Sequence, residues 1–375
     1  MTMTRPVLHF SEVGLGDVST VGGKGASLGE LLRAGIQVPT GFSVTTSAFR
    51  QVVEHLTVDD GSGTQLPVPA GVAALDHAEG DTLARVTATV RQVVESAPLP
   101  AEVADAVKAA YAALCEECGQ PDLPVAVRSS ATSEDSAEAS FAGLQDTYLW
   151  VHGADSVLAH VRRCWASLYS VESVTYRLRR GIPEDDLGMA VVVQRMVGAR
   201  SSGVMFTRSP LSGDKSVVAI DASWGLGSAV VGGDVTPDSF VISKVTGDVK
   251  RTVATKTRWH RPDPWGHGVL ETDVPADLQD RPSVSDAEIA ELVAIGRKVE
   301  ANYGCPQDIE WAVAEGGDVF LLQSRPETVW AGKDAEREAA RKAAPAARPF
   351  DHVFNLLGGK PSGSTEGWRD ESQSG

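Results

Sequence analysis

Four polar side chains alternate with apolar ones along two short runs near residues 308–325, and they could do chemistry together. They are Asp308, Glu310, Gln323 and Arg325. Carboxylate and amide oxygens suit Mg²⁺, a hard cation, and a guanidinium can hold a phosphate through two parallel hydrogen bonds. Such a group could bind a magnesium ion beside a phosphate. The same side chains could instead form a solvent-exposed face with one ion pair.

The element that would position these groups is a β-hairpin. Glu-Gly-Gly-Asp, between the two runs, is favourable for a tight turn. Symmetric closure of that turn places Glu310 opposite Gln323, and Asp308 opposite Arg325, on one face. The alternation of side chains also puts Leu321 on that face. Opposed residues have Cβ atoms about 5 Å apart, so the spacing predicts one polar cluster.

Two other segments could contact phosphates. Gly22-Gly23-Lys24-Gly25 leads into a helix pattern, where glycines permit close backbone approach and Lys24 adds a positive charge. The spacing is not that of a Walker loop, and an ordinary helix start is the alternative. Arg128 is the single charge at the end of an apolar strand, before a loop rich in hydroxyls. Its partner is either an anionic ligand or a nearby carboxylate, Glu134 or Asp135.

Periodicity and turn residues predict the surrounding elements. Helices are expected over residues 82–96, 101–116, 156–180 and 286–303. Strands are expected over 36–44, 189–197, 202–210 and 217–222, the first an edge strand because it contains Pro39. Gln194 lies in a buried strand, where it could read an adenine edge or be a satisfied core amide. Residues 59–80 are predicted to be a surface loop.

Composition limits the classes of function. The chain of 375 residues is long enough for two or three domains, and 42% of it is hydrophobic. With 34 basic and 50 acidic residues, its net charge of −16 argues against a nucleic-acid or anionic-membrane surface. An anionic ligand remains compatible, because a few local cations and backbone N–H groups are enough to bind it.

Cysteine usage and the chain ends predict location. Cys115 and Cys118 form the single C-x-x-C pair, which indicates two free thiols rather than a zinc site. No signal peptide is visible, and no apolar run approaches the ~18 residues of a membrane span. We therefore expect a soluble cytoplasmic protein. Residues 331–375 are polar and then rich in Gly and Ser, which predicts a linker and partly disordered tail.

Four blocks in order resemble a known family. They are GGKGASLGEL at 22–31, AVRSSATSED…SFAGLQDTY at 126–148, VVVQRM…SGVMFTRSP at 191–210, and YGCPQDIEWAV…LLQSRPET at 303–328. Together they resemble the ATP-binding domain of the phosphoenolpyruvate synthase, pyruvate phosphate dikinase and rifampin phosphotransferase family, over about residues 8–330. The resemblance implies an α/β ATP-grasp fold with a nucleotide clamped between two lobes, which we place at 1–188 and 189–330.

The resemblance also assigns nucleotide contacts. It implies that Lys24 and Arg128 contact the phosphates of ATP. Gly143 and Thr147 match positions in the loop that covers the phosphates. Gln194 matches a position on the adenine side.

The hairpin cluster has its own match. Glu310 and Gln323 match positions that bind ATP through a metal, and Arg325 matches the catalytic arginine. The implied cofactors are ATP and Mg²⁺. The opposition of side chains across the hairpin and the resemblance thus select the same three residues.

The family's chemistry implies a partner. In that family, ATP pyrophosphorylates a histidine on a swivelling domain, with release of phosphate and AMP. None of the eight histidines here follows the family's Gly-Gly-x-[ST]-Ser type of segment. The chain therefore resembles the ATP-binding subunit of phenylphosphate synthase. A separate histidine-bearing subunit and an acceptor-binding domain are its expected partners, without which we expect it to be inactive.

Three other readings stay open. Relatives usually have a glutamate where this chain has Ser228, and a hydroxyl is a poorer ligand for Mg²⁺. That difference favours a non-catalytic ATP-binding regulatory module. The chain could also be a domain cut from a full-length phosphoenolpyruvate synthase or rifampin phosphotransferase. Acyl-phosphate ligation is another ATP-grasp chemistry, and it would release ADP rather than AMP.

Overall fold

The computed structural model describes residues 5–334 except for short gaps at 60–62, 76–79, 133–134, 137–138, 141–145, 185–186 and 267. The chain divides into two compact units, Met1–Thr328 and Val329–Gly375. Residues 329–334 of the second unit are helical. The predicted disordered tail lies outside the described residues from 335 onward. No described helix is both long and apolar enough to cross a bilayer.

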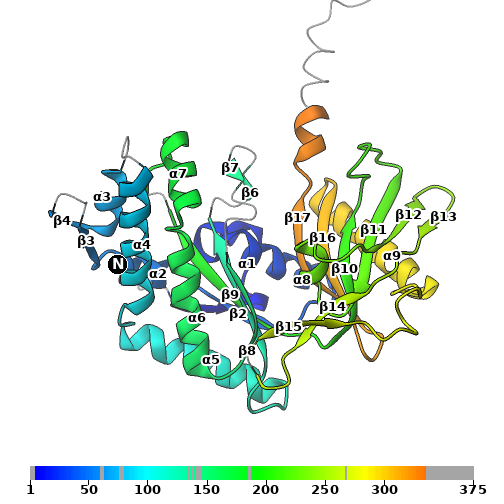
Figure 1. Ribbon diagram of the computed structural model, residues 1–375, viewed down its shortest axis with the longest axis horizontal. Coiled ribbons are helices and arrows are strands. Elements are labelled where there is room, and N and C mark those ends of the chain that lie inside the picture. Colours follow the sequence, from blue (N-terminus) through cyan, green and yellow to red (C-terminus); the bar gives the residue numbers. More distant parts are fainter. Residues whose placement is uncertain are drawn as a thin grey trace, which may run out of the picture. The chain divides into compact units, whose positions relative to one another are not determined.

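The first sheet of the larger unit has five antiparallel strands in the order β1-β2-β9-β5-β8 (Figure 1). They are β1 (Val7–His9), β2 (Gly41–Val44), β9 (Met189–Arg195), β5 (Val125–Ala131) and β8 (Thr147–Val151). The predicted edge strand at 36–44 is wrong in length and place, because β2 begins after Pro39 and pairs with strands on both sides. The predicted lobe division at residue 188 falls just before β9, a central strand of this sheet.

Helices pack around this sheet. They are α1 (Val18–Arg33), α2 (Thr46–Val53), α3 (Val68–Ala73), α4 (Gly80–Ser96), α5 (Ala101–Glu117), α6 (Ala154–Ser167) and α7 (Val171–Arg180), with 3₁₀ turns at Phe10–Glu12 and Leu15–Asp17. The predicted helix over 156–180 is two helices, because Ser170 caps a new one by accepting a hydrogen bond from the Ser173 N–H at 3.1 Å. Cys115 and Cys118 are free thiols, as predicted, and Cys164 and Cys305 are also free.

The predicted loop at 59–80 is only partly a loop. It contains the end of β3 (Thr57–Asp59), β4 (Gln65–Pro67) and α3. Two further short strands, β6 (Asp135–Ser136) and β7 (Ala139–Ser140), pair with each other after β5. Periodicity did not reveal these strands because each has only two or three residues, too few to show alternation.

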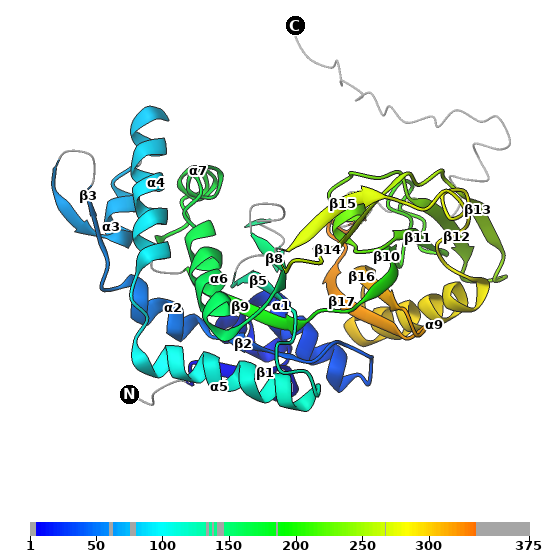
Figure 2. The same ribbon diagram turned by 60° about the horizontal axis from the view of Figure 1, so that its bottom comes forward.

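The second sheet has six antiparallel strands in the order β13-β12-β11-β10-β16-β17. They are β13 (Val249–Thr252), β12 (Asp238–Ser243), β11 (Val217–Trp224), β10 (Ala199–Phe206), β16 (Gln307–Ala314) and β17 (Val319–Pro326). Helix α9 (Asp286–Tyr303) has the predicted Ser285 capping box and Gly304 stop. The short α8 (Ser228–Val231) follows β11. A separate ribbon, β14 (Arg258–Pro262) with β15 (Val269–Asp273), reaches toward β8 (Figure 2).

The β16–β17 hairpin has the predicted pairs, Asp308 opposite Arg325 and Glu310 opposite Gln323. Its turn closes differently, since Ala314 rather than Glu315 pairs with Asp318. A bulge at the position of Leu322 compensates for this shift of one residue. The bulge also interrupts the alternation, so the prediction that Leu321 shares the face of Gln323 is wrong. Leu321 is fully buried in the core of the second sheet.

Helix α1 connects the two sheets within the larger unit. Its Ser27 hydroxyl donates a hydrogen bond to the Ser324 carbonyl of β17 at 2.6 Å. Leu28 and Leu31 pack into the core of the second sheet, which also includes Val192 of β9. The helix that follows the glycine segment is therefore held against strands of both sheets, as a fixed wall beside the hairpin.

A buried ion pair fixes the start of the β14–β15 ribbon. The Lys256 ammonium donates to Asp238 Oδ1 at 2.6 Å, and both side chains are fully buried. Asp238 also accepts hydrogen bonds from the Ser283 N–H and hydroxyl, each at 2.8 Å. All of these groups lie at the junction between the second sheet and the ribbon.

We expect Lys256→Met to destabilise the protein by about 3 kcal/mol, because it leaves a buried carboxylate without its cation. The measurement is the free energy of unfolding in denaturant. Lys108→Met is the matched control, since the Lys108–Asp155 pair has the similar N–O distance of 2.8 Å but is exposed. That control should leave stability unchanged. Equal effects of the two substitutions would contradict the assigned role of burial.

Candidate nucleotide-binding site

A cavity of about 270 Å³ lies between strands of the two sheets. The first sheet contributes Arg128, Thr147 and Gln194 to its walls, and the second contributes Glu310 and residues near the start of α8. Apolar side chains, including Met196 and Leu226, line much of the rest. Four of the residues predicted from the sequence thus meet around one cavity. An apolar pocket with a few polar groups is the usual form of a small-molecule site.

Arg128 links the two sheets at this cavity. Its Nη2 atom donates to Glu310 Oε2 at 2.9 Å and to Gln323 Oε1 at 2.6 Å. Its Nη1 atom donates to the Leu322 carbonyl at 3.1 Å. Among the described residues, the ion pair of Arg128 is with Glu310, 182 positions away. Glu134 and the side chain of Asp135, the partners expected from the sequence, lie outside the described part of the structure.

One atom of Arg128 supports a ligand-binding role. The side chain is largely buried, and its Nε atom has no hydrogen-bond partner among the described residues. A buried donor without a partner costs free energy unless a ligand or water satisfies it. The residue also lines the cavity, and guanidinium groups bind anionic ligands.

Gln194 and Thr147 occupy the first-sheet side of the cavity. The Gln194 amide donates to the Pro39 carbonyl at 3.3 Å, and the side chain is nearly fully buried. Gln194 is thus anchored in the core and also lines the cavity, and its contact with adenine stays a prediction. Thr147 lies opposite Arg128 in the β5–β8 pairing.

Within the described part of the chain, three predicted residues do not line the cavity, namely Lys24, Gln323 and Arg325. Gly143 lies in the gap at 141–145, outside the described residues. Lys24 is buried on α1. Arg325 pairs with Asp308, with its Nε and Nη2 atoms 2.9 and 2.8 Å from Oδ2. Burial raises the pKa of Asp308, and Arg325 opposes that shift.

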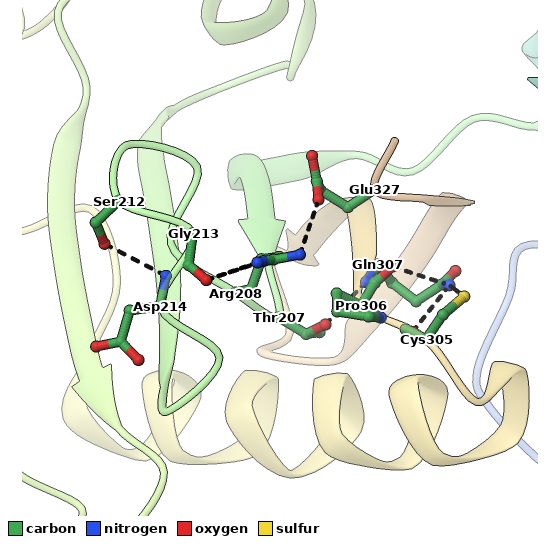
Figure 3. A network of polar contacts seen from close by, with 9 residues as sticks. All are labelled: Thr207, Arg208, Ser212, Gly213, Asp214, Cys305, Pro306, Gln307 and Glu327. Atoms are coloured by element: carbon green, nitrogen blue, oxygen red, sulfur yellow. Dashed lines mark hydrogen bonds and ion pairs between the residues drawn. The ribbon is translucent and has the colours of Figure 1, made fainter. Parts of the chain in front are cut away.

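The base of the hairpin is anchored by a polar network (Figure 3). The Gln307 N–H donates to the Thr207 hydroxyl at 2.8 Å, at the end of β10. The buried Arg208 lies 3.7 Å from Glu327, just after β17, and donates to the Gly213 carbonyl at 2.7 Å. These contacts fix both strands of the hairpin at the end that carries Asp308 and Arg325.

The donor set at Glu310 and Gln323 fits Mg²⁺. It offers one carboxylate and one amide oxygen, which are hard ligands. The described part of the chain contains no group of three or more His, Cys, Asp or Glu residues arranged for a metal. A metal at Glu310 would therefore take its other ligands from phosphates and water, which is how proteins usually bind Mg²⁺.

Comparison with known proteins identifies the family of this chain. Residues 18–345 match the model of the pyruvate phosphate dikinase AMP/ATP-binding domain. The chain therefore belongs to this family of ATP-binding domains. With the mixed α/β architecture, the match confirms the predicted α/β ATP-grasp class.

The relatives are named as phosphoenolpyruvate synthases and a rifampicin phosphotransferase. The chain is 43% identical to a probable phosphoenolpyruvate synthase of Methanothermobacter thermautotrophicus, over 90% of this chain and 48% of that protein. It is 37% identical to the phosphoenolpyruvate synthase of Pyrococcus furiosus, over 95% and 47%. It is 44% identical to a rifampicin phosphotransferase of a Streptomyces species, over 86% and 36%. The chain thus spans about half or less of the relatives that it matches.

Solved structures match far more distantly. An ADP complex of N5-carboxyaminoimidazole ribonucleotide synthetase is 9% identical with a TM-score of 0.29, over 82% of this chain and 46% of that one. Biotin carboxylase of Campylobacter jejuni is 12% identical with a TM-score of 0.24, over 78% and 49%. The family assignment rests on the sequence match and not on these similarities.

Sequence reasoning missed one polar group at the cavity wall. The Ser228 hydroxyl lies 2.8 Å from His260 Nδ1 on the β14–β15 ribbon. His260 Nε2 lies 3.6 Å from Asp234 Oδ2. Ser228 was singled out only as a departure from relatives, and His260 only as lacking the context of a phosphohistidine. No signal in the sequence joins residues 32 positions apart on separate elements.

Proposed function

We propose that this chain binds Mg-ATP in the cavity and serves as the ATP-binding part of a dikinase-type phosphotransferase. Its target is a histidine on a separate swivelling domain, from which a small-molecule acceptor is phosphorylated. The family match supports ATP as the ligand. The observation that carries the proposal is the contact of Arg128 with both Glu310 and Gln323 beside that cavity.

The proposed reaction has two steps, and atoms are conserved in each. A histidine nitrogen attacks the β-phosphorus of ATP, the bond to the α-phosphate oxygen breaks, and AMP leaves. Water then cleaves the pyrophosphorylated histidine, which releases inorganic phosphate and leaves phosphohistidine. Bound at Glu310 and Gln323, Mg²⁺ would neutralise charge on the phosphates.

In this proposal the chain's own residues act by position and charge. Arg128 turns from Glu310 toward the phosphates when nucleotide binds, and Lys24 adds a second cation. Arg325 offsets the charge that develops as the β-phosphoryl group leaves AMP. Thr147 and Gly143 cover the phosphates, while Gln194 faces the adenine.

The test is product analysis with and without a histidine-bearing partner. The chain is incubated with Mg-ATP and the swivelling domain of a related phosphoenolpyruvate synthase or a genetically adjacent protein. AMP and phosphate should form only when the partner is present. ATP binding with no AMP for any partner would favour the regulatory module, and ADP would indicate acyl-phosphate ligation. Either result would contradict the proposed transfer.

A further inference from the structure

The wall of the cavity near α8 carries a hydroxyl whose orientation is fixed by the fold. Ser228 lines the cavity, and its Oγ lies 2.8 Å from His260 Nδ1. The backbone strengthens this link, because the Leu226 N–H donates to the His260 carbonyl at 3.0 Å. The turn that leads into α8 is thus attached to the β14–β15 ribbon by both a main-chain and a side-chain contact.

The tautomer of His260 follows from its other nitrogen. His260 Nε2 lies 3.6 Å from the carboxylate of Asp234, which favours a proton on Nε2. Nδ1 of the neutral ring is then an acceptor. In that tautomer the Ser228 hydroxyl is the donor in the 2.8 Å contact. With its hydrogen directed at His260, Oγ presents only lone pairs to the cavity.

A serine oxygen held in this way selects among the groups of a nucleotide. Phosphate oxygens are acceptors, so they gain no hydrogen bond from it. The donors of ATP are the two ribose hydroxyls and the adenine amine, and Gln194 is the side chain already predicted to face adenine. A ribose hydroxyl is the donor that remains.

The surroundings of His260 keep the ring in place. Glu271 lies directly opposite it on β15 and is paired with Arg258 at 2.8 Å. A second cavity of about 720 Å³ is lined by His260 together with His160 of α6, and it shares Ser228, Thr147 and Leu149 with the nucleotide cavity. A Cβ atom added at Gly268, between β14 and β15, would lie 3.8 Å from the Leu149 carbonyl of β8. The ribbon is therefore supported against the first sheet.

We infer that Ser228, oriented by His260, recognises a ribose hydroxyl and makes the site selective for ribonucleotides. Ser228 is the specificity residue, and His260 is a positioning residue that acts through it. This inference rests on the proposed function, because it requires ATP in the cavity. It adds a contact on the α8 side of the cavity to those predicted for the phosphates and the adenine.

Calorimetric titration of the whole chain with Mg²⁺ and ATP, 2′-deoxy-ATP or 3′-deoxy-ATP tests the inference. The wild-type chain should bind ATP about fivefold more tightly than at least one deoxy analogue, the effect of one hydrogen bond. Ser228→Ala should bring that ratio close to one while ATP still binds. Thermal denaturation of each variant checks that it folds.

Two substitutions of His260 separate positioning from packing. His260→Ala removes the acceptor and should also bring the ratio close to one. His260→Asn places an amide oxygen near the former Nδ1 position, so the ratio should be retained. His160→Ala is the matched control, because His160 lines the second cavity and contacts the Ser156 carbonyl of its own helix. It should keep the wild-type ratio.

The possible results separate a failure of the Ser228 inference from a failure of the proposed ATP-binding function. ATP and both analogues binding equally well to the wild-type chain would overturn the role of Ser228 and leave ATP binding intact. A ratio unchanged in His260→Ala would overturn the positioning role of His260. No binding of ATP would contradict the proposed function and the inference together.

Discussion

Arg325→Ala is expected to slow phosphoryl transfer by about a thousandfold, the scale of an arginine that stabilises transferring phosphates. ATP binding should fall far less, because Arg325 does not line the described cavity and pairs with Asp308 in this structure. The side chain is 41% exposed, so it can turn from Asp308 toward the phosphoryl group that is being transferred. The measurement is AMP formation in a single turnover with the histidine-bearing partner.

Arg325→Lys is the informative companion, because it keeps the charge and loses the planar fork. It should retain part of the rate. Asp308→Asn removes the charged partner of Arg325 and leaves the arginine in place. It therefore separates the role of the ion pair from the role of Arg325 in transfer. A transfer rate that is unchanged in Arg325→Ala would remove Arg325 from the mechanism.

Arg128→Ala is expected to weaken Mg-ATP binding by about 10- to 100-fold, the usual worth of charge-assisted hydrogen bonds to phosphate. Without nucleotide, Arg128 neutralises Glu310 and satisfies Gln323. Its loss therefore removes the phosphate contact and also leaves a carboxylate without its cation. Calorimetric titration with Mg-ATP gives the change in Kd directly.

Two further substitutions serve as controls for Arg128→Ala. One keeps the positive charge, and the other removes an exposed arginine elsewhere in the fold. Arg128→Lys should have an intermediate Kd, because a lysine supplies charge without a bidentate fork. Arg5→Ala removes an exposed arginine paired with Glu12 at 2.6 Å and should leave the Kd unchanged. A wild-type Kd in Arg128→Ala would show that the phosphates do not lie at this arginine.

The hairpin shows which features of the structure can be predicted from local sequence patterns. Alternation and turn composition correctly paired Glu310 with Gln323 and Asp308 with Arg325. The bulge at Leu322 was not predictable, because it depends on how the turn closes and on the burial of Leu321 against the second core. The symmetric closure that was assumed gave the right outer pairs only because the bulge offset a shift in the turn.

Contacts between residues far apart in the sequence could not be predicted from local sequence patterns. Arg128 was recognised as a cation that needs a partner, but nothing near it in sequence pointed to a hairpin more than 180 residues away. The same holds for Ser228 and His260. Among the elements, the 156–180 helix was predicted as one because its apolar periodicity runs across Ser170, whose cap divides it. Gly143 lies outside the described residues, so its role stays a prediction.

The central claim is that the cavity beside Arg128 holds the phosphates of Mg-ATP. The structure of the chain crystallised with Mg²⁺ and a non-hydrolysable ATP analogue tests it most directly. We expect adenine beside Gln194, phosphates within hydrogen-bond distance of Arg128, and the metal against Glu310. A nucleotide bound elsewhere, with Arg128 still paired to Glu310, would contradict it.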